Sequence, residues 1–183
     1  MEKFFLGLLI VLILLALPYF SKLYGLKKIH KSDIPETGDW VKLSRGNIYF
    51  EWFLPSSSVD PKGVMVLVHG FSTPSFVWGG LINNFVNAGY KVLVYDHFGR
   101  GFSERPRVAY DKSLYLETLR ELIISQNIEE SVHLVGYSMG GPIVGYYADT
   151  YPDNTKSVSL IAPAGFSKVT SATKSWRTMP IIG

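Results

Sequence analysis

The sequence contains no cysteine, and this absence excludes disulfides, zinc–thiolate sites and a cysteine nucleophile. Internal repeats and low-complexity tracts are also missing. Charged residues are few, at 18%, whereas apolar residues reach 47%, so the composition is that of a folded chain rather than a disordered one. With 183 residues, the chain is long enough for one domain with a hydrophobic core.

The small excess of positive charge belongs to the N-terminal segment. Residues 1–31 carry five lysines and one glutamate, and the rest of the chain carries 13 basic and 14 acidic residues. No basic patch interleaved with aromatic residues occurs beyond that segment. This distribution argues against a face that binds nucleic acid.

A run of 17 residues without charge, Phe4–Phe20, lies close to the N-terminus. Its uniform apolarity predicts a transmembrane helix, and we expect residues 1–29 to form a single-pass membrane anchor, with the polar residues 30–39 as a linker. A cleaved signal peptide is an alternative, although no small-x-small cleavage site follows, and a buried core helix is another. Four lysines follow the run and one precedes it, which favours a cytoplasmic position for the C-terminal side.

Short apolar runs and helical patterns alternate along the rest of the chain. Two β-rich runs on either side of residues 45–47 predict a hairpin. Continuous apolar runs predict strands that are buried on both faces, as in a parallel sheet. The expected strands are 41–43, 48–54, 64–68, 92–95, 132–135 and 158–161, and the expected helices are 77–88, 113–126 and 141–151.

Strands that alternate with helices predict an α/β fold with a mostly parallel sheet and flanking helices. In such sheets, functional residues gather at the carboxyl ends of the strands. Three polar, glycine-rich segments follow expected strands: 69–71, 96–103 and 136–141. We therefore expect a functional site where these three segments meet.

The last segment contains Gly136-Tyr137-Ser138-Met139-Gly140, which fits the pattern G-x-S-x-G. Between a strand and a helix, this pattern places the serine on a sharp turn. Glycines two residues before and two after the serine let strand and helix approach without Cβ clashes. The pattern predicts Ser138 as a catalytic nucleophile. A glycine-rich turn whose serine only caps the helix is the structural alternative.

Acyl transfer at Ser138 needs two amide donors for the oxyanion of a tetrahedral intermediate. The residue after the nucleophile, Met139, supplies one, and the loop after the earlier strand supplies the other, which we expect to be the amide of Phe71. His69 and Gly70 begin this loop. We expect His69 to be structural rather than the base, because it precedes the nucleophile and belongs to the His-Gly pair that shapes the loop.

Four motifs occur in order: V-M-V-L-V-H-G-F, Y-D-H-F-G-R-G-F-S-E-R-P, V-H-L-V-G-Y-S-M-G-G and S-L-I-A-P-A-G-F. With them, residues 40–166 resemble the α/β-hydrolase superfamily, in particular its lipase, esterase and monoacylglycerol-lipase-like branch. The resemblance implies the α/β-hydrolase fold, a serine nucleophile at Ser138, oxyanion amides at Phe71 and Met139, and a bracing role for the loop that begins at Asp96.

The same resemblance limits the classes of reaction that we expect. Haloalkane dehalogenases and epoxide hydrolases of this fold use aspartate at the elbow, so the serine argues against them. The expected substrate is a small-molecule or lipid ester, and the expected membrane anchor makes a lipid ester plausible. No metal and no organic cofactor is implied.

The triad partners that the resemblance implies, an acid and then a histidine after the nucleophile, are missing. Only the acids Asp149 and Asp153 follow Ser138, both on or just after the helix that leaves the elbow, and no histidine follows it. We therefore expect a chain truncated at its C-terminus, with residues 167–183 as the start of a cap and strand 158–161 as an unprotected sheet edge. A non-catalytic remnant that binds a partner or lipid is one alternative. A second chain that supplies the missing half is another.

Overall fold

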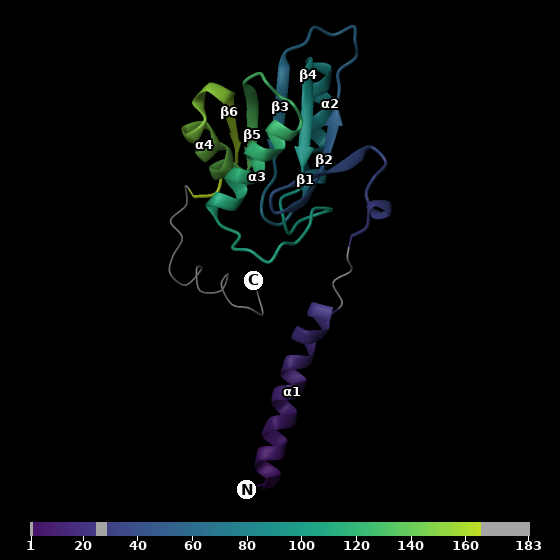
Figure 1. Ribbon diagram of the computed structural model, residues 1–183, viewed down its shortest axis with the longest axis vertical. Helices are drawn as coiled ribbons and strands as arrows, with labels where there is room; N and C mark the ends of the chain where they lie inside the picture. The colour runs from purple at the N-terminus through teal and green to yellow at the C-terminus, as the bar shows by residue number, and fades with distance from the viewer. Residues whose placement is uncertain (1, 25–28, 166–183) are drawn as a thin grey trace. The chain divides into compact units, whose positions relative to one another are not determined.

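The computed structural model describes residues 2–24 and 29–165, which fall into two units: the N-terminal helix, and a compact unit that begins at Ile29 (Figure 1). Each unit is described by itself. The helices are α1 (Glu2–Tyr24), α2 (Gly79–Asn87), α3 (Lys112–Ser125) and α4 (Gly140–Thr150), with the short 3-10 helices η1 (Lys31–Asp33), η2 (Ser75–Trp78) and η3 (Pro152–Asn154). The strands are β1 (Gly38–Leu43), β2 (Gly46–Phe53), β3 (Gly63–Val68), β4 (Tyr90–Tyr95), β5 (Val132–Tyr137) and β6 (Thr155–Ile161).

The apolar N-terminal run does form a helix, α1, with Pro18 inside it. Within residues 2–24 and 29–165, however, no helix combines the length and the apolar character that a membrane crossing requires. The predictions of a transmembrane helix and of a single-pass membrane localisation are therefore wrong. The physical reason lies in the uncharged run Phe4–Phe20: at about 1.5 Å per residue, it reaches roughly 26 Å, which falls short of a hydrocarbon core of about 30 Å.

Six strands form one sheet in the order β1-β2-β4-β3-β5-β6. β1 and β2 pair as an antiparallel hairpin, and β2 pairs antiparallel with β4. The pairs β4–β3, β3–β5 and β5–β6 are parallel. The α/β fold with a mostly parallel sheet, and the hairpin that precedes it, are confirmed.

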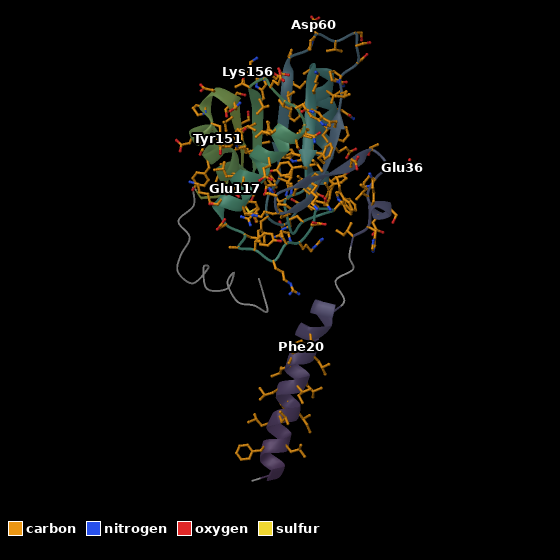
Figure 2. The ribbon with its side chains drawn as sticks, in the orientation of Figure 1. Phe20, Glu36, Asp60, Glu117, Tyr151 and Lys156 are labelled. Atoms are coloured by element: carbon orange, nitrogen blue, oxygen red, sulfur yellow. The ribbon has the colours of Figure 1, made fainter. Side chains whose placement is uncertain are left out.

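Helices cover both faces of the sheet, as Figure 1 shows. On one face, Leu119 of α3 and Val144 of α4 belong to the larger buried cluster. On the other face, Trp78 and Ile82, from η2 and α2, pack with residues of β3, β4 and β5. Figure 2 shows the side chains that fill the space between these layers. Strands covered on both faces need apolar residues at successive positions, which explains the continuous runs in the sequence.

The last strand, β6, differs from the central strands because most of its residues are exposed. Val158 is 37% exposed and Leu160 is 45% exposed. Among the described residues, β6 pairs only with β5, so its outer side is an open sheet edge, as expected from the sequence.

The strand order brings the three glycine-rich segments together. β3 lies between β4 and β5, and all three strands run in the same direction. Their carboxyl ends therefore lie side by side, and they are followed by His69, Asp96 and Ser138. This edge of the sheet is where the α/β arrangement places functional residues.

Candidate active site

Ser138 lies on the tight turn between β5 and α4, and its φ angle is +51°. A side chain other than glycine in this left-handed region costs of order 1–3 kcal/mol and persists only where surrounding contacts hold it. Here the Ser138 N–H donates to the carbonyl of Ile161 at 3.0 Å. The Ser138 carbonyl accepts from the N–H groups of Gly141 at 3.0 Å and Ala164 at 2.9 Å. Three backbone hydrogen bonds thus hold the strained turn.

The two glycines of the G-x-S-x-G pattern stand where a side chain has no room. A Cβ on Gly136 would lie 2.5 Å from the carbonyl oxygen of Gly140. A Cβ on Gly140 would lie 2.0 Å from the carbonyl oxygen of Val68, at the end of β3. The absence of side chains at these positions lets α4 begin directly against the neighbouring strand.

The loop after β3 lies against the serine. A Cβ on Gly70 would meet the Cβ of Ser138 at 3.0 Å and its Oγ at 3.4 Å. Gly70 therefore leaves open the space immediately beside the hydroxyl. A reacting carbonyl that approaches Ser138 needs such a space, with amide donors at its border.

His69 is fully buried, and both of its ring nitrogens have partners. Its Nδ1 lies 2.7 Å from the carbonyl oxygen of Gly70, and its Nε2 accepts the backbone N–H of His97 at 2.9 Å. A carbonyl only accepts and an amide N–H only donates, so the proton of His69 is on Nδ1. Burial lowers the pKa of His69, which favours this neutral form. Neither nitrogen is free to take a proton from Ser138.

The hydrogen bond from His69 also orients the next peptide group. The Gly70–Phe71 peptide is trans, so the N–H of Phe71 points away from the side on which His69 holds the carbonyl of Gly70. Arg100 fixes the following group, because its Nε donates to the carbonyl of Phe71 at 2.5 Å. Two side chains therefore hold the peptide groups on either side of the predicted donor.

The second predicted donor, Met139, is the N-cap residue of α4, in the right-handed helical conformation. Amide groups at the start of a helix have no partner within the helix and carry partial positive charge. The N–H of Met139 thus belongs to a group suited to an anion. The roles of Phe71 and Met139 in an oxyanion hole stay predictions.

Asp96 is buried, and both of its carboxylate oxygens accept backbone N–H groups. Oδ1 accepts from Ser75 at 2.7 Å, and Oδ2 accepts from Phe102 at 2.9 Å. The hydroxyl of Ser103 donates to the Asp96 carbonyl at 2.6 Å and accepts from the Tyr49 N–H at 2.9 Å. These contacts tie the loop after β4 to β2 and to η2, the arrangement that a bracing role requires.

The structure pairs His69 with His97, a relationship that the sequence analysis missed. The two imidazole centroids lie 4.2 Å apart, and Nε2 of His97 donates to the carbonyl of His69 at 3.1 Å. Nδ1 of His97 is buried without a hydrogen-bond partner. Burial holds the pKa of His97 well below its ordinary value, so this ring is also neutral. The only signal in the sequence was that each histidine directly follows, or lies one residue beyond, a buried strand.

The other histidine of the sheet, His133, does not join the site. It lies on β5, with Nδ1 2.7 Å from the hydroxyl of Ser157 on β6. Within the described part of the chain, no group of three or more His, Asp or Glu side chains could hold a metal ion. The prediction that the chemistry needs no metal or cofactor stays untested.

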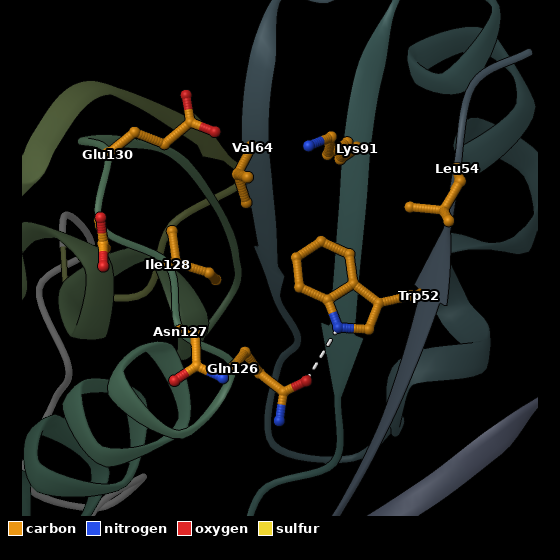
Figure 3. Close-up of a pocket in the computed structure, with 9 residues that line it drawn as sticks. Trp52, Leu54, Val64, Lys91, Gln126, Asn127, Ile128 and Glu130 are labelled. Atoms are coloured by element: carbon orange, nitrogen blue, oxygen red, sulfur yellow. Dashed lines mark hydrogen bonds between the residues drawn. The ribbon is translucent and has the colours of Figure 1, made fainter. Parts of the chain in front are cut away.

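One pocket, drawn in Figure 3, lies at the opposite end of the strands from Ser138. Its volume is about 650 Å³, and it is lined by residues at the starts of β3 and β4 and by the loop before β5. Trp52 faces Gln126 across it, and the indole N–H donates to Oε1 of Gln126 at 2.9 Å. Another pocket, of about 230 Å³, borders Asp96 and Phe102.

Comparison with known proteins gives a family match over much of the chain. A family model described as alpha/beta hydrolase fold matches residues 63–180. A monoacylglycerol lipase from Mycolicibacterium smegmatis is 34% identical over 121 residues, which cover 64% of this chain and 42% of the lipase.

Comparison with solved structures also gives matches that cover most of this chain. A bromoperoxidase from Bacillus anthracis superimposes with a TM-score of 0.61 at 30% identity, covering 69% of this chain and 44% of that one. An esterase from Exiguobacterium antarcticum superimposes with a TM-score of 0.62 at 25% identity, and the match covers 70% of this chain and 46% of the esterase. The chain thus spans less than half the length of each of these three relatives.

Proposed function

Because the chain belongs to the alpha/beta hydrolase family, we propose that it forms the nucleophile-bearing part of a serine hydrolase that acts on carboxylic esters. The observation that carries the proposal is the strained turn at Ser138, which three backbone hydrogen bonds hold at a φ of +51°. The similarity to a monoacylglycerol lipase and to an esterase supports an ester as substrate.

In this mechanism the Oγ of Ser138 attacks the ester carbonyl carbon and gives its proton to a base. The N–H groups of Phe71 and Met139 stabilise the oxyanion that forms. Collapse of the tetrahedral intermediate breaks the bond to the alcohol, which leaves with a proton, and an acyl-serine remains. Water then repeats the addition and releases the carboxylic acid.

The base is the part that the described residues do not supply. Both nitrogens of His69 are engaged, and the Nδ1 of His97 is buried. No histidine follows Ser138 in the sequence. We therefore propose that the triad acid and base come from polypeptide outside residues 1–183. With the oxyanion hole and substrate binding alone, the reaction rate would be about 10³–10⁴-fold above the rate in water.

Labelling with a fluorophosphonate tests this function. We expect the chain alone to label slowly, and the chain extended in frame by its downstream coding sequence to label rapidly at Ser138. Ser138→Ala should abolish labelling, whereas Ser159→Ala, which removes an exposed hydroxyl on β6, should not change it. If the extended chain does not label, the hydrolase proposal is wrong.

A second candidate is a non-catalytic binding protein that keeps the fold. The observation that favours it is the engagement of both His69 nitrogens in structural hydrogen bonds. The same experiment separates the two functions, since a binding protein would not label in either form.

A further inference from the structure

Of the three arginines in the loop between β4 and α3, two, Arg100 and Arg105, contact the backbone of the segment that begins at Asp96. Arg100 donates to the carbonyls of Phe71 and Gly99, and Arg105 lies 3.3 Å from the carbonyls of Ser103 and Gly101. These are contacts to neutral groups. Among the described residues, neither arginine has a carboxylate partner.

The acidic residues of the same loop are turned to other partners. Both oxygens of Asp96 accept backbone N–H groups. Both oxygens of Glu104 bind Asn47, one through its backbone N–H and one through its side-chain amide, each at 2.8 Å. Asp111 accepts the N–H of Leu114 as the N-cap of α3. The loop thus commits its carboxylates to backbone and amide partners, whereas, within the part of the chain that the structure describes, the guanidinium groups of Arg100 and Arg105 contact only neutral carbonyls and the Phe71 ring.

Arg100 reaches the predicted oxyanion loop directly. Its guanidinium carbon lies 4.2 Å from the centroid of the Phe71 ring, in addition to the hydrogen bond to the Phe71 carbonyl. The preceding residue, Gly70, is the one that borders Ser138. Arg100 therefore contacts the residue that directly follows the one bordering Ser138.

Arg105 shares its surroundings with Arg100 through Tyr110. The ring of Tyr110 packs on Gly99, where an added Cβ would lie 2.9 Å from it. Burial raises the pKa of the Tyr110 phenol, while the charges of Arg100 and Arg105 act in the opposite direction. Nη2 of Arg105 lies 3.3 Å from the carbonyl of Gly101, the residue that directly follows Arg100.

We propose that Arg100 and Arg105 form an anion subsite, and that the ester substrate carries an oxyanion group, a carboxylate or a phosphate, which this subsite holds while the ester carbonyl lies at Ser138. The inference rests on the proposed function and names the substrate class. Guanidinium groups bind both oxyanions through paired hydrogen bonds, so one subsite serves either chemistry.

Equilibrium binding to the full chain carrying Ser138→Ala tests the subsite without depending on catalysis. The probes are monoethyl glutarate, which carries one carboxylate, diethyl glutarate, its neutral counterpart, and monobutyl phosphate. We expect monoethyl glutarate or monobutyl phosphate to bind more tightly than diethyl glutarate, and the tighter of the two names the oxyanion. Because the arginines are partly exposed, Arg100→Gln and Arg105→Gln should each weaken anion binding by about threefold to tenfold.

Lys62→Gln is the matched control, because it removes one positive charge at the opposite end of the sheet, before β3. It should leave anion binding unchanged. Arg100→Lys keeps the positive charge but loses the paired N–H donors of the guanidinium group. Its affinity for the anionic probes should lie between those of the Ser138→Ala parent and Arg100→Gln. Circular dichroism of each variant checks folding, and Arg105→Gln carries the test if Arg100→Gln does not fold.

Two results would overturn the subsite: equal binding of the neutral and anionic probes, or anion binding that both glutamine variants retain. Its failure is distinguishable from failure of the hydrolase proposal. Arginine-dependent anion binding without labelling of Ser138 would reject only the catalysis, and labelling without arginine-dependent binding would reject only the subsite.

Discussion

The imidazoles of His69 and His97 lie 4.2 Å apart, and His97 donates two hydrogen bonds to His69. The His97 N–H donates to the Nε2 of His69, and the Nε2 of His97 donates to the carbonyl of His69. Both rings are buried and neutral. The pair therefore links the ends of β3 and β4, and through Gly70 it reaches the peptide group beside Ser138.

This pair predicts how stability depends on pH. The pKa of both histidines is lowered below the ordinary value of 6.5, so the unfolded chain binds protons first as the pH falls. Stability is then fully present above about pH 6.5 and is lost as the pH falls below it. The free energy of unfolding, measured in urea between pH 5.5 and 7.5, should fall by up to about 1.4 kcal/mol per pH unit for each histidine.

The variant His97→Asn removes one of these two titrating groups. Its unfolding free energy should be lower at pH 7.5 and should depend less on pH. A wild-type stability that is flat, or that rises as the pH falls from 7.5 to 5.5, would contradict the neutral, buried pair.

Backbone strain at Ser138 gives a second prediction. Because the φ of Ser138 is +51°, Ser138→Gly should be more stable than Ser138→Ala by about 1 kcal/mol, since only glycine adopts this region without penalty. Both variants lack the hydroxyl, so the comparison isolates the backbone. Midpoints of urea unfolding measure it, and equal stabilities would mean that the turn stores no strain.

Close packing at the start of α4 gives a third prediction. Gly140→Ala would bring a Cβ to 2.0 Å from the Val68 carbonyl oxygen, so it should destabilise the fold by about 3 kcal/mol or more. Gly145, on the same helix, has no atom within 4 Å of an added Cβ. Gly145→Ala should therefore be neutral or stabilise by up to about 1 kcal/mol. Thermal unfolding of the two variants checks the contrast, which similar losses for both would refute.

The buried carboxylate of Asp96 gives a fourth prediction. Asp96→Asn replaces one accepting oxygen by an amide that faces a backbone N–H, so it should cost about 2 kcal/mol. Asp39 also accepts a backbone N–H, from Trp40, and it pairs with Lys31, but it is exposed. Asp39→Asn should cost less than about 1 kcal/mol. Urea unfolding at pH 7.5 measures both, and a small loss at Asp96 would mean that the loop does not depend on its carboxylate.

Most secondary structure could be predicted because burial leaves a pattern in the chain. Strands covered on both faces read as continuous apolar runs, such as Val64–Val68, and glycines mark the turns. The same reasoning was wrong for the N-terminal helix, where uniform apolarity indicated a membrane span that the described helix does not provide. Apolarity reports only that a segment avoids charge, and a membrane crossing requires length and apolar character in the same stretch.

In the arrangement around Ser138, too, the sequence predicted some features and not others. The spacing of Gly136, Ser138 and Gly140 already predicted the turn, and the requirement at Gly136 is local, because its Cβ would meet the carbonyl of Gly140. The requirement at Gly140 is tertiary, because its Cβ would meet the carbonyl of Val68 on the neighbouring strand. The contacts of His69 with His97, and of Arg100 with Phe71, join residues 28 and 29 positions apart. They exist only because β3 and β4 are neighbours in the sheet.

By itself, then, the sequence determined where the strands, helices and strained turn form, since these follow from local sterics and from the period of apolar residues. Only the tertiary structure decided which histidine nitrogens are occupied and which arginines lack a carboxylate. Such partnerships depend on strand order and burial, and residues distant in the chain acquire them only when the sheet brings them together.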